Sequence, residues 1–155
     1  MAQKRDIADI MQSLRRIFKA IQQYSEDVFK EFGVTGPQLW ALRTIYTQGP
    51  LSMGELSRSM YLHISTASGV VDRLERRGYV ERNREDSDRR VVKISLTSAG
   101  KRLVQRGPEA AQGKLLHGLE SLSSAEVRVI RSSLERVVRL MEIQDMRATF
   151  FFSEE

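Results

Sequence analysis

The chain has 155 residues and a formal net charge of +5, and it contains no cysteine. This length suits one domain, and a hydrophobic content of 41% supports a packed core without disulfide bonds. The lack of cysteine excludes thiol redox sensing and cysteine-ligated zinc. The two histidines, His63 and His117, are far apart and have no carboxylate at metal-ligand spacing. We therefore expect neither a metal nor any other cofactor.

The basic charge is concentrated in the middle of the chain. Residues 61–106 contain 11 Lys and Arg against 6 Asp and Glu, whereas the remainder contains 14 of each sign. Such a distribution favours a polyanionic partner, although a solvated basic surface gives the same count. No apolar run approaches the roughly 20 residues of a membrane span, and the charged N-terminus is unlike a signal peptide. We expect a cytoplasmic protein with no membrane partner.

Two helices are predicted before residue 50. Apolar residues at three- and four-residue spacings predict a long amphipathic first helix that ends near Gly33. The stretch Thr35–Gln38 combines a capping threonine, a proline suited to a first turn and a glutamine that completes a capping box. It predicts a second helix that stops at Gly49. We expect its aromatic residues, Trp40 and Tyr46, to belong to the core, with a ligand-binding site as the alternative.

A helix-turn-helix pattern follows. Ser52–Glu55 is another capping box and opens a short helix to about Met60, and after a break a further helix runs to Arg77. The predicted buried face of this second helix consists of Ile64, Ala67, Val71 and Leu74. Its opposite face is small, polar and basic, and consists of Ser65, Thr66, Ser68, Gly69, Asp72, Arg73 and Arg76.

The periodicity then changes from helical to alternating. Two alternating stretches, from Val80 to Arg84 and from Val92 to Leu96, flank the polar run Glu85–Arg90 and predict a hairpin with a charged tip. Thr97 is the expected cap of the next helix, and the chain then stays helical to about residue 144, with an interruption at Gly107-Pro108. A third capping box, Ser123–Glu126, opens the last predicted helix. The apolar tail Phe150–Phe152 has no assigned role.

These motifs, taken in order, resemble the MarR family of winged helix-turn-helix regulators. The matching features are Val71–Gly78, the wing sequence Asp86–Arg90, Leu96–Gly100 and the upstream loop Gly33–Gln38. The expected fold is mainly α with a small β-hairpin wing, in one MarR-like domain spanning residues 1–155. Residues 35–100 would form the DNA-binding lobe, and residues 1–32 and 101–146 would form a helical dimerisation region.

A helix that enters the major groove needs small polar side chains and an arginine that can contact guanine or phosphate. Ser65, Thr66, Ser68, Gly69 and Arg73 are therefore the candidates on the helix, although exposed residues of a core helix would look alike. The resemblance implies that the wing enters the adjacent minor groove through Arg90, with Asp88 as its orienting partner. Alternate residues on a strand share a face, which would let Asp88 hold the Arg90 guanidinium.

Arg84 and Arg89 are candidate phosphate contacts from the wing. A solvated turn with a surface ion pair is the alternative interpretation of the wing tip.

The terminal helices carry more apolar surface than one small lobe can cover, which predicts a homodimer on a palindromic double-stranded operator. The resemblance further implies a repressor released by a small aromatic or anionic effector. A winged-helix module that binds protein instead of DNA is the competing interpretation, and salt-dependent DNA binding would separate the two. The sequence contains no P-loop, GxSxG elbow or metal triad, so we expect no enzymatic activity.

Overall fold

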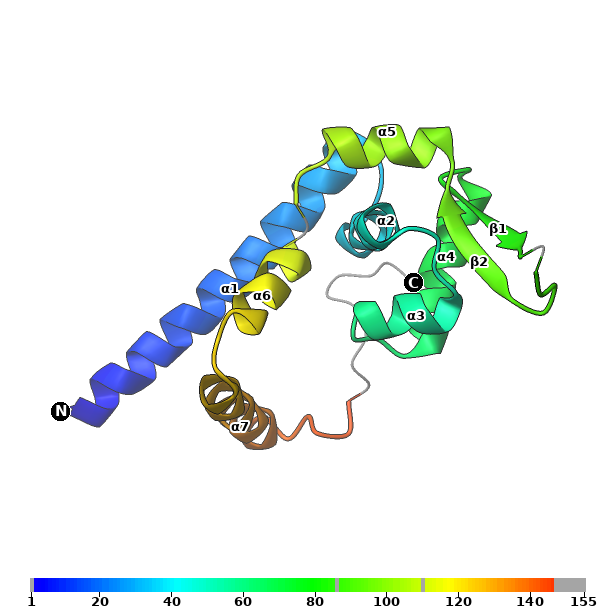
Figure 1. Ribbon diagram of the computed structural model, residues 1–155. Helices are drawn as coiled ribbons and strands as arrows, with labels where there is room; N and C mark the ends of the chain where they lie inside the picture. The colour runs from blue at the N-terminus through cyan, green and yellow to red at the C-terminus, as the bar shows by residue number, and fades with distance from the viewer. Residues whose placement is uncertain (1, 86, 110, 147–155) are drawn as a thin grey trace.

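The computed structural model describes residues 2–85, 87–109 and 111–146. Asp86 of the wing motif and the Phe150–Phe152 tail lie outside the described residues. The elements, in chain order, are α1 (Ala2–Phe32), α2 (Gly36–Gln48), α3 (Met53–Ser59), α4 (Ile64–Arg76), β1 (Val80–Arg84), β2 (Val92–Leu96), α5 (Ser98–Arg106), α6 (Ala111–Glu120) and α7 (Ser124–Leu140). The prediction of a mainly helical protein with a β-hairpin wing is confirmed (Figure 1).

The helix starts follow from local capping chemistry. Thr35, Ser52 and Ser123 each accept a hydrogen bond from the backbone N–H three residues later. In each case the third residue returns a side-chain acceptor to the cap, so all three predicted capping boxes are confirmed. Helix α5 ends just before the predicted interruption at Gly107-Pro108.

The core lies inside the lobe formed by α2 to α5 and the hairpin. Helix α2 passes through its middle, and Leu39 and Leu42 are completely buried there together with Leu56 and Leu74 of the helix-turn-helix. The base of the hairpin is joined to this core by backbone hydrogen bonds in both directions between Leu51 and Ile94. Figure 1 shows α2 surrounded by α3, α4 and α5, with the hairpin at the edge.

The terminal helices differ sharply from this lobe in burial. Val28 is the one buried residue among those described in α1, and α7 has none. Apolar side chains recur along one face of each helix and stay in contact with solvent, for example Ile10 (53% exposed), Phe18 (50%) and Leu134 (54%). In Figure 1 the N-terminal half of α1 and the whole of α7 extend away from the lobe.

The two aromatic residues of α2 do not both join the core. Tyr46 is 47% exposed, so the expectation that it is a core residue is wrong. It lies near the end of α2, where its hydroxyl accepts a 3.5 Å hydrogen bond from Gln105 of α5 at the surface. Trp40 is partly buried and packs against the core cluster.

The junction between the hairpin and α5 requires close backbone packing at Gly100. A Cβ atom placed on Gly100 would lie 2.1 Å from the carbonyl oxygen of Tyr79. Thr97, just before this helix, donates its hydroxyl to the Gly78 carbonyl and caps the Gly100 amide. Glycine at position 100 therefore lets α5 pack directly against the start of the wing.

Candidate nucleic-acid interface

Helix α4 is fixed in the lobe through one face. Ala67, Val70, Val71 and Leu74 are its buried residues. Val70 was not among the predicted set, whereas Ile64 was and is 57% exposed, so that part of the prediction is wrong. Ile64 shares a helical face with Ala67 and Val71, but it lies in the first turn and is not part of the core cluster.

The solvent-exposed face of α4 carries the residues that were predicted to contact DNA. Ser65 and Gly69 are exposed, and Thr66, Ser68 and Arg73 are partly exposed. A Cβ atom on Gly69 would meet nothing within 4 Å, so packing inside the protein does not require glycine there. The missing side chain instead leaves the helix backbone open to close approach by a partner such as DNA.

The turn that precedes α4 is tightly shaped. Tyr61 has a positive φ of 54°, a backbone conformation that is uncommon for a residue with a large side chain. His63 occupies the N-cap position of α4, and its side chain makes no capping hydrogen bond. The imidazole of His63 therefore does not contribute to this helix start.

The far end of α4 is held by an arginine. The Arg77 guanidinium donates to the carbonyl of Gly33, between α1 and α2, and lies 5.4 Å from the centre of the Tyr79 ring. Arg77 therefore links the end of the helix to the base of the long N-terminal helix.

The hairpin is a regular antiparallel pair with a polar tip. Val80 pairs with Leu96, Arg82 with Ile94 and Arg84 with Val92. Val80, Ile94 and Leu96 are buried at the base, whereas Arg84 and Val92 are exposed near the tip. The structure thus presents the predicted Arg84 at the outer end of the hairpin.

The tip itself is a turn rather than a continuation of the strands. The Asp88 carboxylate accepts a 3.0 Å hydrogen bond from the backbone N–H of Arg90, and the Arg90 Nε atom lies 3.5 Å from the same oxygen. The proximity of Asp88 and Arg90 therefore comes from turn geometry, and not from the shared strand face that we expected. The Arg90 side chain is 94% exposed, and Arg89 is exposed beside it.

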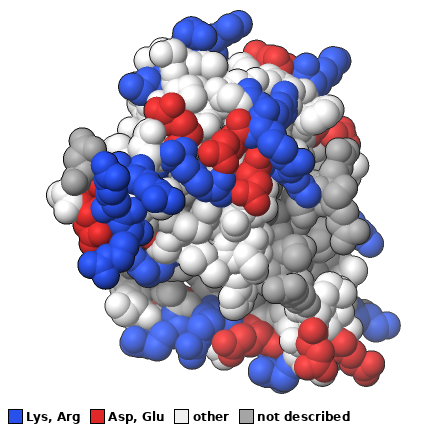
Figure 2. Space-filling model, turned by 90° about the vertical axis from the view of Figure 1, so that its right-hand side faces the viewer, with Lys and Arg blue, Asp and Glu red and all other residues white. Residues whose placement is uncertain are grey.

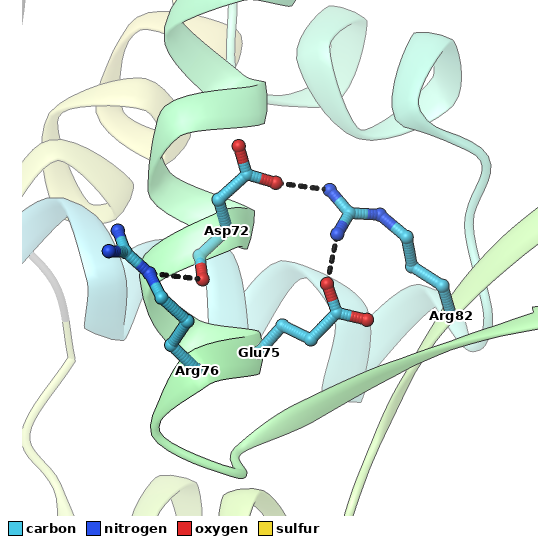
Figure 3. Close-up of polar contacts among 4 residues, drawn as sticks. All are labelled: Asp72, Glu75, Arg76 and Arg82. Atoms are coloured by element: carbon cyan, nitrogen blue, oxygen red, sulfur yellow. Dashed lines mark hydrogen bonds and ion pairs between the residues drawn. The ribbon is translucent and has the colours of Figure 1, made fainter.

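One functional candidate in the hairpin was missed by the sequence interpretation. Arg82 points from the inward face of β1 toward α4, where its guanidinium forms ion pairs with Asp72 and Glu75 (Figure 3). The hydrogen bond from Arg82 to Asp72 raises the pKa of the guanidinium above its ordinary value. The available signal was an arginine at an inward-facing strand position, combined with two carboxylates one helical turn apart.

The other strand is anchored to α3. The Lys93 ammonium lies 2.7 Å from the Glu55 carboxylate, which also accepts the Ser52 backbone N–H at 2.7 Å. These hydrogen bonds, that from Lys93 first, lower the pKa of Glu55 from 4.5 to about 2. Each strand of the wing is therefore tied by an ion pair to one helix of the helix-turn-helix.

The molecular face on the hairpin side carries mixed charge. Figure 2 shows several groups of Lys and Arg side chains there, with Asp and Glu side chains between them. Two of the acidic residues between 61 and 106, Asp72 and Glu75, are already paired with Arg82. The face is thus less uniformly basic than the count over residues 61–106 suggested.

An open cavity lies between the lobe and the C-terminal helices. It has a volume of about 700 Å³ and is mostly apolar, and its lining includes Trp40, Tyr61, Leu115, Leu119, Val127 and Arg128. A smaller cavity of about 320 Å³, whose lining is more polar than that of the larger one, shares Trp40 and also contacts Arg43 and His117. The lining of the larger cavity therefore combines residues from the turn before α4 with residues from α6 and α7.

Other kinds of site find no support in the part of the chain that the structure describes. It contains no group of three His, Cys, Asp or Glu residues suited to a metal ion. No helix in the described ranges is long and apolar enough to cross a bilayer. The exposed helix face and the arginine-bearing hairpin define a winged helix-turn-helix protein.

Comparison with known proteins identifies the family. Residues 34–92 match the model of the MarR family. The chain is 35% identical to the HTH-type transcriptional regulator YsmB of Bacillus subtilis, over 88% of this chain and 93% of YsmB. It is 28% identical to the HTH-type transcriptional repressor MdtR of the same organism, over 91% of this chain and 93% of MdtR. A MarR family protein from Bacillus stearothermophilus has a similar structure, with a TM-score of 0.55 and 34% identity over 90% of this chain and 97% of that chain.

The chain belongs to the MarR family of helix-turn-helix transcriptional regulators, which bind DNA and are not enzymes.

Proposed function

We propose that the protein is a cytoplasmic homodimeric repressor that binds a palindromic operator and is released by a small effector. The observation that carries this proposal is the pairing of an open, small-residue face on α4 with a wing whose Arg90 is 94% exposed. The similarity to the repressor MdtR supports repression over activation.

On the operator, α4 would occupy the major groove and the wing the adjacent minor groove. Ser65, Thr66, Ser68 and Gly69 would allow close approach, and Arg73 would contact guanine or phosphate. Arg90 would enter the minor groove, where a narrow groove concentrates negative potential, with Asp88 restricting its orientation. Arg84 and Arg89 would contact phosphates on either side.

The direct test is a titration of duplex DNA at fixed salt, using a duplex obtained by in vitro selection with the full-length protein. Arg90→Ala should weaken binding by about tenfold, which corresponds to the loss of one contact of about 1.4 kcal/mol. Arg73→Ala should weaken binding to the selected duplex more than to random DNA if Arg73 reads a base. Full affinity in both variants would refute the proposed interface and favour a protein-binding winged helix.

Dimerisation is supported by the unburied apolar faces of α1 and α7. A twofold pair would cover these faces and would place two α4 helices about one DNA turn apart, which matches a palindromic site.

Effector binding is supported by the 700 Å³ cavity and its lining. The mostly apolar wall suits a small aromatic molecule, and an anionic group on it would pair with Arg128, whereas Glu120 in the same lining would repel that group. An occupant would contact both Tyr61, in the turn before α4, and Val127 of α7, and it could therefore shift the lobe relative to the terminal helices. Since Trp40 is the only tryptophan in the chain and lines the cavity, its fluorescence should report binding of a small panel of aromatic carboxylates. Unchanged fluorescence and unchanged DNA affinity would argue against an effector of this class.

A further inference from the structure

Arg82 occupies an unusual position for a charged residue. It lies on the same face of β1 as the buried Val80, and its partner in the register is Ile94, which is 1% exposed. An apolar side chain would be expected at an inward-facing position of this kind. Arg82 instead directs its guanidinium across the base of the wing to α4 (Figure 3).

The guanidinium binds two carboxylates with separate nitrogens. Its Nη2 atom lies 2.6 Å from Asp72 Oδ1, and its Nη1 atom pairs with Glu75 Oε2. Asp72 and Glu75 are three residues apart, so they project from neighbouring positions of α4. Because the guanidinium is planar and rigid, two such bonds restrict its orientation much more than one would.

The carboxylates also lie on the side of α4 that the proposed function assigns to DNA. Asp72 is exposed, as are Gly69 and Ser65 one and two turns earlier. Negative charge there opposes approach to phosphates, so these two acids weaken the generic attraction for DNA. Their placement next to a reading face is understandable if they serve to fix the wing.

We propose that Arg82 is a positioning residue that fixes the angle between the wing and helix α4, so that Arg90 and the reading face engage DNA together. Arg82 acts through Asp72 and Glu75 and does not itself contact DNA. This inference rests on the proposed operator contact of Arg90.

A double-mutant cycle tests the coupling. The loss of DNA affinity caused by Arg90→Ala is measured in the wild-type background and in the Arg82→Gln background, with the selected duplex at one salt concentration. We expect about a tenfold loss of affinity in the wild type and less than about threefold in the Arg82→Gln background, because a displaced wing gains little from Arg90. Arg82 pairs with Asp72 and Glu75, whereas Arg90 pairs with Asp88, so such coupling is unexpected for independent sites. Lys19→Gln, on the exposed face of α1, is the control for the loss of one positive charge.

A second variant separates positioning from charge. Asp72→Asn/Glu75→Gln keeps Arg82 but removes both of its partners and two negative charges. Electrostatics alone predicts tighter binding to all DNA and an unchanged Arg90→Ala penalty. Positioning predicts tighter binding to random DNA only, together with a reduced Arg90→Ala penalty on the selected duplex. If circular dichroism shows that Arg82→Gln does not fold, this second variant still tests the positioning role of Arg82.

The outcomes distinguish the inference from the proposed function. No effect of Arg90→Ala in the wild type would overturn both, because the wing would not contact the operator. A tenfold penalty that persists in Arg82→Gln and in Asp72→Asn/Glu75→Gln would leave the operator contact intact and would overturn the role of Arg82.

Discussion

The arginines of the winged helix-turn-helix lobe fall into two groups according to how strongly contacts within the protein engage them. Arg43, Arg77 and Arg82 bind backbone carbonyls or carboxylates of the protein itself. Arg90 lies 3.5 Å from the Asp88 carboxylate, but its side chain is 94% exposed at the wing tip. A count of basic residues cannot separate these groups, because the distinction depends on which side chains the fold brings together. The excess of basic residues over 61–106 therefore overstates the cations available to a nucleic acid.

Tyr24 offers a test of packing in the junction between α1 and α2. Its hydroxyl is buried with no hydrogen-bond partner, and burial raises its pKa to about 12. An unpaired buried hydroxyl is costly, so Tyr24→Phe should raise the free energy of unfolding by about 1 kcal/mol. Urea unfolding at one protein concentration measures this change. Tyr46→Phe, which alters an exposed hydroxyl, should have almost no effect, and a destabilised Tyr24→Phe variant would reveal a partner for the hydroxyl.

The low pKa of Glu55 predicts how acid weakens the anchor of β2. Because this pKa falls from 4.5 to about 2 on folding, the unfolded state binds the proton more readily between these values. The stabilising contribution of Glu55 is therefore fully present above pH 4.5 and disappears as the pH falls toward 2. Glu55→Gln should be less stable than wild type at neutral pH, and the difference should shrink across this range. Thermal unfolding at several pH values measures it, with Glu135→Gln on the surface of α7 as control; a gap independent of pH would contradict the assignment.

At the scale of secondary structure, local signals were sufficient to locate most elements. The capping boxes at Thr35, Ser52 and Ser123 specify helix starts through contacts within four residues, so the sequence alone reveals them. The errors fall where burial depends on other elements. Ile64 has the correct helical spacing but lies outside the core, and Tyr46 lies at the surface near the end of its helix. The Arg82 bridge spans a strand and a helix, which periodicity within either one cannot show.

The junction between the wing and α5 gives a prediction at this scale. Gly100→Ala would place a methyl group 2.1 Å from the Tyr79 carbonyl oxygen, so α5 or the start of β1 must move. We expect a loss of about 3 kcal/mol or more in the free energy of unfolding, at the upper end of overpacking effects. Gly118→Ala is the matched control, because its Cβ would meet nothing within 4 Å and alanine favours a helix. Equal stability of both variants would show that the junction is looser than described.

At the scale of the whole molecule, the lobe and the terminal helices differ in how completely their apolar side chains are buried. The lobe has a closed core of fully buried side chains, whereas the apolar residues of α1 and α7 remain exposed. The sequence already predicted this excess of apolar surface from the length of the amphipathic stripes. It could not predict the cavity beside Tyr61, because that space depends on how α6 and α7 lie relative to the lobe.

If the apolar face of α1 forms the proposed dimer interface, a charge introduced into that face should weaken dimerisation. Phe18→Asp would place a carboxylate within the apolar face and should shift the protein from dimer to monomer at low micromolar concentration. Sedimentation velocity measures the shift. Gln12→Asp introduces the same charge on the opposite face of α1 and should leave the dimer intact. A wild-type chain that sediments at 17.8 kDa would refute the dimer and the palindromic operator together.

The ion pairs of Arg82 divide helix α4 into two halves that should differ in how well they tolerate substitution. In the second half, Asp72 and Glu75 are engaged by the wing, and Arg77 just beyond it is bound to the Gly33 carbonyl. Among the described residues, the ion pairs between α4 and the wing leave out the first half of the helix, from Ser65 to Gly69. New operator preferences should therefore arise most readily by substitution in the first half, since changes there leave the wing anchored. Mutational libraries restricted to Ser65, Thr66, Ser68 and Gly69, which leave the buried Ala67 unchanged, should yield folded regulators with altered specificity more often than libraries in the second half.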